Sequence, residues 1–412
     1  MNSSTLTAGL RRLRDFSSQD ESRLARLNAF RREILALLAE EDATVDRYGA
    51  AAEASEAELC CPVSYDPAAL SHIPKEILDI DYGCGDPTVF AEDGQTVLDL
   101  GSGSGKHCFM IAKKVGPKGR VIGIDKTPQM LEKSSAAIPE VMSNLGFTDP
   151  NVEFRCGHIE NLKIDRSQLL ELIETQPLET YDDLEALETK LAKPLVASES
   201  VDLVVSNCVL NLVDDERKRQ LFREIFRVVK KGGGVAISDI VADRPIPEDM
   251  KQDDDLWTGC LSGAFQRHEF HQVFERAGFH GMQEAKSSFW KTVGGINFFS
   301  VTILAQKGKQ GPCYETYRQA LYEGPFSEIR DDDGHVFQRG LWTPVCQKTA
   351  ELLQQKPYVG HFLVTPALED PAKKIPFDCG TPGGGRDLPA DIAAQLQSIT
   401  ESGACCTDEG CC

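Results

Sequence analysis

Three cysteines in the central part of the chain, Cys84, Cys208 and Cys260, could bind a soft ion. Cys208 directly follows a predicted strand over residues 201–206, and Cys260 lies in the segment after a predicted strand over 234–239. Open α/β sheets place reacting groups outside the carboxyl ends of their strands. Cys208 and Cys260 are therefore expected to lie together at the opening of the same site. Three converging thiols without a fourth suit a three-coordinate thiophilic ion such as trivalent arsenic. A buried structural thiol is the alternative for each.

A glycine-rich loop over residues 101–105 predicts a site for a nucleoside-type ligand, because it follows a predicted strand and opens a predicted helix. Its N–H groups and the helix N-terminus can hold a carboxylate or a ribose edge. Asp125, at the end of the next strand, is placed to accept two ribose hydroxyl hydrogens. The Gly-Ser-Gly-Ser-Gly spacing differs from that of a pyrophosphate loop. Asp99, just before it, would repel a pyrophosphate and suits the amino group of a methionine moiety.

The elements that must position these residues alternate between strand and helix from residue 65 to residue 307. Predicted strands lie at 96–100, 120–125, 152–155, 201–206, 234–239 and 298–305, and predicted helices lie at 106–115, 128–142 and 216–229. This alternation predicts an α/β fold with a doubly wound parallel sheet. Leucines at helical spacing over residues 164–195 predict a helical insertion within it.

The remaining chain predicts three further parts. Residues 1–64 are expected to form an N-terminal helical segment, because apolar residues recur at helical spacing. Residues 308–395 have more Gly, Pro and aromatic residues and little periodicity, which indicates a small C-terminal domain. Residues 396–412 form a Cys-rich tail that ends in two cysteine doublets.

Composition excludes several classes of function. The chain has 412 residues and a formal net charge of -20, so it should repel nucleic acid. Its first residues are polar and no run of 18 apolar residues occurs, so neither a secretory signal nor a membrane span is expected. We therefore expect a cytoplasmic protein. In that compartment, 14 cysteines indicate metal, metalloid or redox chemistry rather than structural disulfides.

The segment Asp99–Gly105, together with Asp125, resembles the signature of class I S-adenosylmethionine (AdoMet)-dependent methyltransferases. The resemblance implies a Rossmann-like core and AdoMet as the cofactor. It implies that Met130 packs on the adenosine, that Ile159 and Glu160 contact the adenine, and that Asn207 faces the methyl group. The cofactor-binding residues that it implies are Asp99, Gly101, Ser102, Gly103, Gly105, Asp125, Lys126, Met130, His158, Ile159, Glu160 and Asn207.

Four segments in one order, 73–85, 99–105, 206–212 and 259–264, resemble the arsenite methyltransferases over residues 60 to 305. This resemblance implies that Cys208 and Cys260, together with Cys84 as a third ligand, hold trivalent arsenic during methyl transfer. It also implies that Cys84 forms disulfides in a thiol relay with an N-terminal cysteine. Cys60 and Cys61 are both candidates for that partner.

The expected reaction begins with arsenite as a complex with a small thiol such as glutathione, whose ligands exchange onto the protein thiolates. The arsenic lone pair then attacks the AdoMet methyl group, and no general base is needed. Oxidation to a pentavalent product would leave a protein disulfide, which a thioredoxin-like reductant would reduce. We expect a monomer with no nucleic-acid or membrane partner.

The sequence leaves two alternative functions open. The chain could be an AdoMet-dependent methyltransferase for an organic small molecule, which usually needs a general base, and His158, His268 and His271 are available. It could instead be a thiol-rich metalloid-binding protein without turnover. The intact Asp99 and Asp125 argue against this second alternative.

Overall fold

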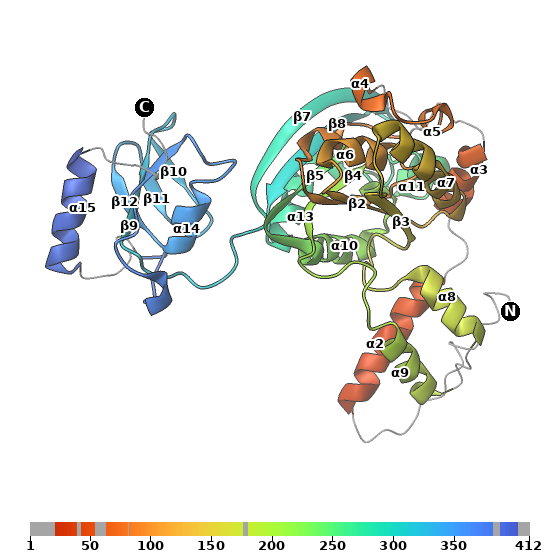
Figure 1. Ribbon diagram of the computed structural model, residues 1–412, viewed down its shortest axis with the longest axis horizontal. Coiled ribbons are helices and arrows are strands. Elements are labelled where there is room, and N and C mark those ends of the chain that lie inside the picture. The colour runs from red at the N-terminus through yellow and green to blue at the C-terminus, as the bar shows by residue number, and fades with distance from the viewer. Residues whose placement is uncertain are drawn as a thin grey trace. The chain divides into compact units, whose positions relative to one another are not determined.

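The computed structural model describes residues 21–38, 43–53, 63–80, 82–175, 180–381 and 388–402 of the chain (Figure 1). The chain divides into two compact units, Met1–Lys307 and Gly308–Cys412.

The first unit is built on a sheet whose strands run in the order β3-β2-β1-β4-β5-β8-β7, with β6 paired to β5. The strands are β1 (Thr96–Leu100), β2 (Arg120–Asp125), β3 (Val152–Cys156), β4 (Val201–Asn207), β5 (Val229–Ala242), β6 (Phe265–Gln266), β7 (His280–Val293) and β8 (Ile296–Gln306). Pairing is parallel from β3 through to β5. The carboxyl ends of β1, β2 and β4 therefore meet at one edge, where the predicted site residues lie.

The sheet is not wholly parallel, which corrects the sequence-based expectation. β8 is antiparallel to β5, and β7 is antiparallel to β8. Two glycines, Gly294 and Gly295, join β7 to β8, and both have positive φ. A two-residue turn of this kind closes a hairpin, so the second strand must return antiparallel to the first.

Helices cover both faces of the sheet because its central strands carry apolar side chains on both faces. Leu98 and Leu100 of β1 belong to a core with α10 (Asp215–Val228) and α13 (Arg267–Ala277). Val97 belongs to a second core with α6 (Lys106–Val115) and α7 (Pro128–Leu145). Alternate residues of one strand thus anchor opposite layers, as the two-residue period of a strand requires.

The residues at the helix ends explain where α7 begins and ends. Pro128 opens α7, where its missing N–H has no intrahelical partner to lose. Gly146 ends α7 with a φ of 70°, which a glycine adopts without steric cost. α10 ends at Val228, and β5 begins at Val229 rather than at the predicted residue 234.

The N-terminal segment and the insertion form a small helical cluster. Helix α2 (Glu21–Leu37) packs with α8 (Arg166–Thr175) and α9 (Tyr181–Lys190) around buried residues such as Leu27 and Ile34. The insertion is therefore helical, and its apolar face is covered by a segment from the start of the chain. Helices α3 (Ala43–Glu53), α4 (Pro67–Leu70) and α5 (Lys75–Leu78) and the 3-10 helix η2 (Pro87–Phe90) lead to β1.

The remaining short elements of the first unit lie near the carboxyl ends of β4 and β5. They are η3 (Leu210–Leu212), α11 (Glu248–Lys251) and α12 (Asp254–Thr258).

The second unit consists of small sheets and two longer helical segments. Its elements are β9 (Arg318–Tyr322), β10 (Glu328–Arg330), β11 (Val336–Gln338), β12 (Trp342–Val345), α14 (Gln347–Leu352), β13 (Phe362–Val364), η4 (Pro371–Lys373) and α15 (Ala390–Ser402). β12 and β13 flank β9 in antiparallel pairing, and β10 pairs with β11. The expected boundary between residues 395 and 396 falls inside α15, so the helix continues into the stretch that the sequence assigns to the tail.

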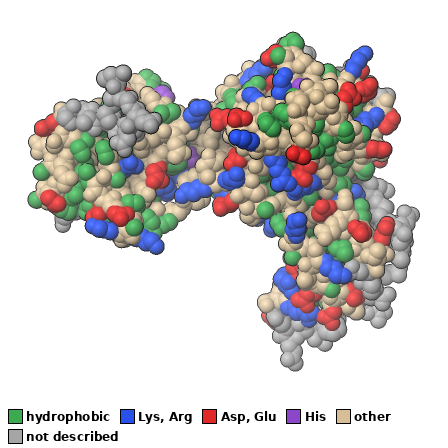
Figure 2. Space-filling model, in the orientation of Figure 1, with side chains coloured by type: hydrophobic (Ala, Val, Ile, Leu, Met, Phe, Trp, Pro, Cys, Tyr) green, Lys and Arg blue, Asp and Glu red, His purple; other side chains and the backbone are tan. Residues whose placement is uncertain are grey.

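The surface drawn in Figure 2 carries Lys and Arg side chains interspersed with Asp and Glu. None of the helices in the described ranges is long and apolar enough to cross a membrane.

Candidate functional site

The glycine-rich loop and Asp125 form a connected binding surface at the carboxyl ends of β1 and β2. Gly103 N–H donates to Asp125 Oδ2 and Thr127 N–H donates to Asp125 Oδ1, each at 2.8 Å. Gly101, Gly103 and Gly105 all have positive φ, which favours glycine at each position. A Cβ at Gly101 would lie 2.4 Å from Val209 Cγ1, so this glycine also permits close packing. Burial raises the pKa of Asp125.

A cavity of about 440 Å³ opens over this loop. Eleven of the predicted cofactor and thiol residues line it, namely Gly101, Ser102, Gly103, Asp125, Lys126, Met130, His158, Ile159, Glu160, Asn207 and Cys208. The sequence-based prediction thus identified residues from four separate strand ends that the fold brings to one cavity.

Two predicted cofactor residues do not line the cavity. Asp99 is 2% exposed and accepts a hydrogen bond from Cys108 Sγ at 3.3 Å. Burial raises the pKa of Asp99 to about 7. Gly105, with a φ of 91°, is the N-cap of α6. Both residues therefore support the loop from within the fold, and the direct contact expected between Asp99 and an amino group stays a prediction.

Three ionisable side chains form the cavity wall at the end where the adenine is predicted to bind. Arg217 donates to Glu160 Oε1 at 2.8 Å, and His158 Nδ1 lies 3.4 Å from the same oxygen. Burial acts to raise the pKa of Glu160, but the hydrogen bond with His158 and the charges of His158 and Arg217 lower it overall. Arg217 comes from α10 and was not identified from the sequence, because no motif links it to Glu160.

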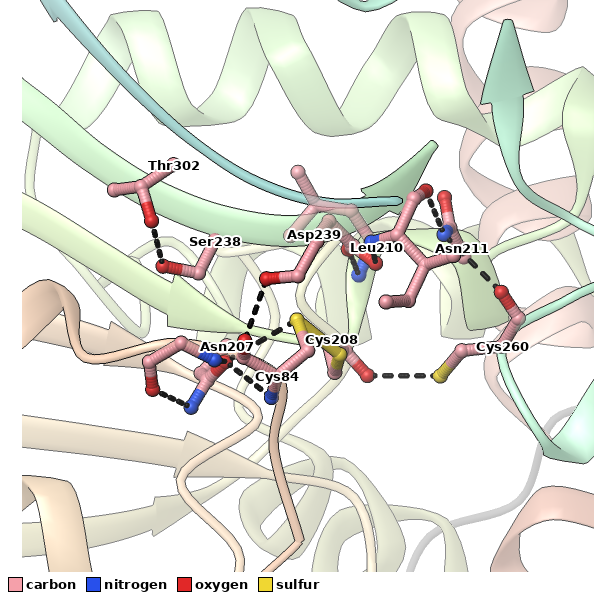
Figure 3. Close-up of a disulfide and its surroundings, with 12 residues drawn as sticks. Cys84, Asn207, Cys208, Leu210, Asn211, Ser238, Asp239, Cys260 and Thr302 are labelled. Atoms are coloured by element: carbon pink, nitrogen blue, oxygen red, sulfur yellow. Dashed lines mark hydrogen bonds between the residues drawn. A yellow bond between two sulfur atoms is a disulfide. The ribbon is translucent and has the colours of Figure 1, made fainter. Parts of the chain in front are cut away.

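The predicted thiols converge at the carboxyl end of β4 (Figure 3). Cys84 and Cys208 form a disulfide with a Cα–Cα distance of 5.9 Å. The Cys260 thiol donates to the Cys208 carbonyl oxygen at 3.0 Å. The structure therefore brings together the three cysteines that the sequence singled out from segments more than 50 residues apart.

The disulfide differs from the predicted pairing of Cys84 with an N-terminal cysteine. Cys60 and Cys61 lie outside the described residues. The Asn207 side chain explains why Cys84 lies beside Cys208: its Oδ1 accepts N–H bonds from Cys84 and Gly85, each at 3.0 Å. Its Nδ2 donates to the Gly85 carbonyl at 2.8 Å. One amide side chain thus holds the Cys84 segment against the end of β4.

Cys208, which follows β4, and Cys260, which follows α12, both have a left-handed backbone. Cys208 has a φ of 59° and Cys260 a φ of 62°, and only three other non-glycine residues in the described ranges share this feature. This conformation costs free energy for a residue with a Cβ, so it persists only where the surroundings impose it. The contacts around Cys208 and Cys260 therefore impose this backbone conformation, which cysteine itself does not favour.

Buried polar groups beneath the thiols hold these segments. Asp239 is fully buried, and its Oδ2 accepts from Leu210 N–H at 2.9 Å. Burial raises the pKa of Asp239 to about 7. Asn211 Nδ2 donates to the Ile240 carbonyl at 2.7 Å and to the Cys260 carbonyl at 3.3 Å (Figure 3). Ser300 Oγ donates to the Cys84 carbonyl at 2.5 Å.

Sequence reasoning missed these supporting residues and several cavity residues. Tyr48 and Trp257 line the cavity beside the thiols, and burial raises the pKa of Tyr48, with Cys260 adding to the effect. His107 Nε2 lies 3.3 Å from Asn207 Nδ2. A buried polar residue at the carboxyl end of a strand, such as Asp239, is a signal that could have been used. Tyr48 gave none, because it lies on a helix outside the sheet.

Comparisons with known proteins identify the relatives of this chain. A family described as a methyltransferase domain matches residues 91–175 and 179–278, and a domain of unknown function matches residues 309–387. An arsenite methyltransferase of Aquipseudomonas alcaligenes is 32% identical over 84% of this chain and 93% of its own length. The Homo sapiens arsenite methyltransferase is 30% identical over 76% of this chain and 77% of its own length.

Among solved structures, an arsenic (III) S-adenosylmethionine methyltransferase from Chlamydomonas reinhardtii is similar to this chain. The two share 28% identity with a TM-score of 0.52, over 73% of this chain and 96% of that chain.

Proposed function

Because this chain belongs to the arsenite methyltransferase family, we propose that it transfers the methyl group of AdoMet to trivalent arsenic held by its cysteine thiolates. It is an AdoMet-dependent methyltransferase, and the methylated arsenicals that it forms fit a role in detoxification. The observation that carries the assignment of the site is the convergence of Cys84, Cys208 and Cys260 beside the cavity over the glycine-rich loop.

The cavity residues suit AdoMet, which supplies an electrophilic methyl group on a sulfonium. A carboxylate has about four lone-pair positions. Asp125 accepts hydrogen bonds from Gly103 N–H, Thr127 N–H and the Thr127 side chain. Its remaining capacity is available for a ribose hydroxyl. Met130 and Ile159 offer apolar surface to an adenine ring. Asn207 lies between this pocket and the thiols, so the methyl group is expected near it.

The thiols bind the substrate by exchange of its ligands. Arsenite, delivered as a glutathione complex, would transfer onto reduced Cys84, Cys208 and Cys260. Three thiolates neutralise the trivalent ion and leave its lone pair for in-line attack on the methyl group. The protein aligns the reactants and excludes water, and both effects lower the barrier.

We propose that the disulfide between Cys84 and Cys208 forms during turnover. Methyl transfer raises arsenic to the pentavalent state, and two thiolates that give up two electrons as a disulfide return it to the trivalent state. We propose that a thioredoxin-like reductant or glutathione then reduces the disulfide, with Cys60 or Cys61 relaying the exchange through Cys84. We also propose a monomer in the cytoplasm, where a reducing environment would maintain these thiols.

Speciation of arsenic tests the function. We expect the reduced protein, with arsenite, glutathione and AdoMet, to yield methylated arsenic over many turnovers, as measured by chromatography with elemental detection. Cys208→Ser and Cys260→Ser should abolish methylation and leave AdoMet affinity within about threefold. Cys156→Ser, at the end of β3, serves as the matched control and should retain activity.

Two results would contradict the proposal. Full activity of Cys208→Ser on arsenite would remove the thiols from the reaction. AdoMet binding with arsenic that stays inorganic would point to an organic acceptor or to metalloid binding without turnover.

A further inference from the structure

A second cluster of three cysteines lies in the C-terminal unit. The sulfur atoms of Cys313, Cys346 and Cys379 all lie within 4.8 Å of one another. Cys346 is fully buried, and the other two are half-buried. The family that matches residues 309–387 is described as having no known function, so this cluster has no assigned role.

Backbone hydrogen bonds hold the three cysteine segments together. Phe377 N–H donates to the Cys313 carbonyl at 3.0 Å, two residues before Cys379. Gln347 N–H donates to the Tyr314 carbonyl at 2.8 Å, one residue after both Cys346 and Cys313. The Cys313 segment therefore lies between the other two and is bonded to each. The convergence of the thiols is a property of the backbone and not of side-chain rotamers alone.

Cys346 has a defined orientation. It is the N-cap of α14, and its Sγ accepts from Thr349 N–H at 3.4 Å. The backbone of α14 thereby fixes the position of the sulfur.

The spacing of the sulfurs suits one shared ion. The centre of a triangle with sides of 4.8 Å lies about 2.8 Å from each corner, and a typical metal–thiolate bond is about 2.3 Å long. Side-chain shifts of a few tenths of an ångström would bring all three sulfurs into bonding distance.

The charges around the cluster favour a neutral complex. Lys348 lies 3.6 Å from Asp333, and Lys309 lies 3.4 Å from Asp333 and 3.0 Å from Asp332. These two cations and two anions carry no net charge together, and Lys348 also bonds to Cys313. A divalent ion with three thiolates would carry a net negative charge beside the buried Cys346, which is costly. A trivalent ion with three thiolates is neutral.

We propose that Cys313, Cys346 and Cys379 form a second binding site for inorganic trivalent arsenic, separate from the site of methyl transfer. Arsenous acid would lose its three hydroxyl groups as three waters, taking up the three thiol protons. Three As–O bonds break, three As–S bonds form, and no electrons are transferred. The choice of arsenic among thiophilic ions rests on the proposed function, whereas the existence of a three-thiol site does not.

The three-thiol geometry also predicts selectivity. A methyl group occupies one coordination position of arsenic, so methylated trivalent arsenicals could bond to only two of the thiols. The site should therefore hold inorganic arsenite at least tenfold more tightly than a monomethylated trivalent arsenical, and so separate substrate from product.

The test measures arsenic binding to the full chain in a background that lacks the thiols of the methyl-transfer site, the Cys60–Cys61 doublet and the cysteines of the tail. The background carries serine in place of Cys60, Cys61, Cys84, Cys208, Cys260, Cys405, Cys406, Cys411 and Cys412. It cannot methylate arsenic, so failure of the transfer reaction cannot affect the result. We expect native mass spectrometry of the reduced protein with arsenite to show one arsenic atom per chain.

Further substitutions assign that atom. Cys379→Ser and Cys313→Ser, each alone, should weaken arsenite binding at least tenfold, whereas Cys156→Ser should not change it. Cys346→Ser retains an N-cap acceptor, so α14 should remain folded in this variant. X-ray absorption should report three sulfur neighbours around arsenic.

Three outcomes would overturn the proposal: no arsenic bound by the background protein, arsenic retained by the variant that lacks all three cluster cysteines, or equal affinity for the monomethylated arsenical. Binding of Zn²⁺ in place of arsenite would overturn the assignment of the ion.

Discussion

At the residue scale, Asn207 and Asp239 position the thiols that would hold the substrate. The Asn207 side-chain oxygen accepts backbone hydrogen bonds from Cys84 and Gly85, and Asn207 directly precedes Cys208 in the sequence. Asp239 accepts backbone N–H bonds from Leu210, Ile240 and Asn211, directly beneath the same turn. The turn at Cys208 is therefore fixed on two sides, by the Cys84 segment through Asn207 and by β5 through Asp239.

Asp125 is expected to contribute most to AdoMet affinity. Asp125→Asn removes a carboxylate that accepts charge-assisted hydrogen bonds, and each such bond contributes about 1.5–3 kcal/mol. We therefore expect AdoMet affinity to fall by about 10- to 100-fold. Equilibrium dialysis measures it, with Asp149→Asn, at an exposed position, as the control. A change below threefold would remove Asp125 from the binding site.

Asp239 should make stability depend on pH. Its pKa in the folded state is raised to about 7 by burial, above its value in an unfolded chain. The folded state therefore binds this proton more tightly, and stability is lost as the pH rises through 7. The contribution to the free energy of unfolding should be about 1 kcal/mol larger at pH 6 than at pH 8.

Urea unfolding at both pH values measures this difference. Other groups titrate in this range, so the comparison is with Asp239→Asn, in which the difference between pH 6 and pH 8 should shrink by that amount. An unchanged difference in the variant would mean that Asp239 is ionised at both pH values.

At the element scale, the segment after α12 has to lie against η3 for Cys260 to reach Cys208. Asn211 of η3 donates to the Cys260 carbonyl, and Lys218 of α10 donates to the Gly263 carbonyl at 2.8 Å. Between these anchors, the Asn211 carbonyl lies so close to Gly263 that a Cβ there would be 1.9 Å from its oxygen. Only glycine permits this contact.

Gly263→Ala should therefore displace Cys260 while the glycine-rich loop and Asp125 stay in place. Backbone atoms cannot yield as a flexible side chain can, so the segment must move. We expect the rate of arsenite methylation to fall at least tenfold, with AdoMet affinity within about threefold of the original. Gly380→Ala, where the nearest atom is a side-chain oxygen at 3.4 Å, is the control. Normal methylation by Gly263→Ala would show that the position of Cys260 is not critical.

At the scale of the whole molecule, the two units carry separate cores and separate thiol clusters. All cavity-lining residues lie before Lys307, and Cys313, Cys346 and Cys379 lie after it. The second unit has its own buried residues, such as Phe337 and Val345. A ligand that binds one unit should therefore stabilise that unit directly.

Thermal unfolding should accordingly show two transitions. AdoMet at 100 times its Kd should stabilise only the first unit, by about 2.7 kcal/mol, and so raise one Tm. Phe337→Ala, in the core of the second unit, should lower the other Tm, because loss of a buried Phe side chain costs about 3–5 kcal/mol. Differential scanning calorimetry measures both. A single transition that moves in both experiments would show that the units unfold together.

Local sequence was sufficient for the central elements of the first unit and for the chemistry expected of the central site. Alternating apolar runs and glycine-rich turns predicted β1, β2 and β4 and the helices that follow β1 and β2, because period and turn chemistry are local properties. The loop and Asp125 identified the cofactor, and Cys84, Cys208 and Cys260 identified the class of acceptor. What remained open was every relation that depends on pairing across the chain.

Only the tertiary structure decided those relations. It paired Cys84 with Cys208, because Asn207 binds the Cys84 segment across 123 residues. It placed Asp99 beneath the loop rather than in the cavity, turned β7 and β8 antiparallel, and joined Arg217 to Glu160. It also gathered Cys313, Cys346 and Cys379, whose spacing in the sequence resembles no ion-binding motif. Such contacts arise from packing between distant segments, and hydrophobic and hydrogen-bonding patterns along a chain do not encode which distant partner a side chain meets.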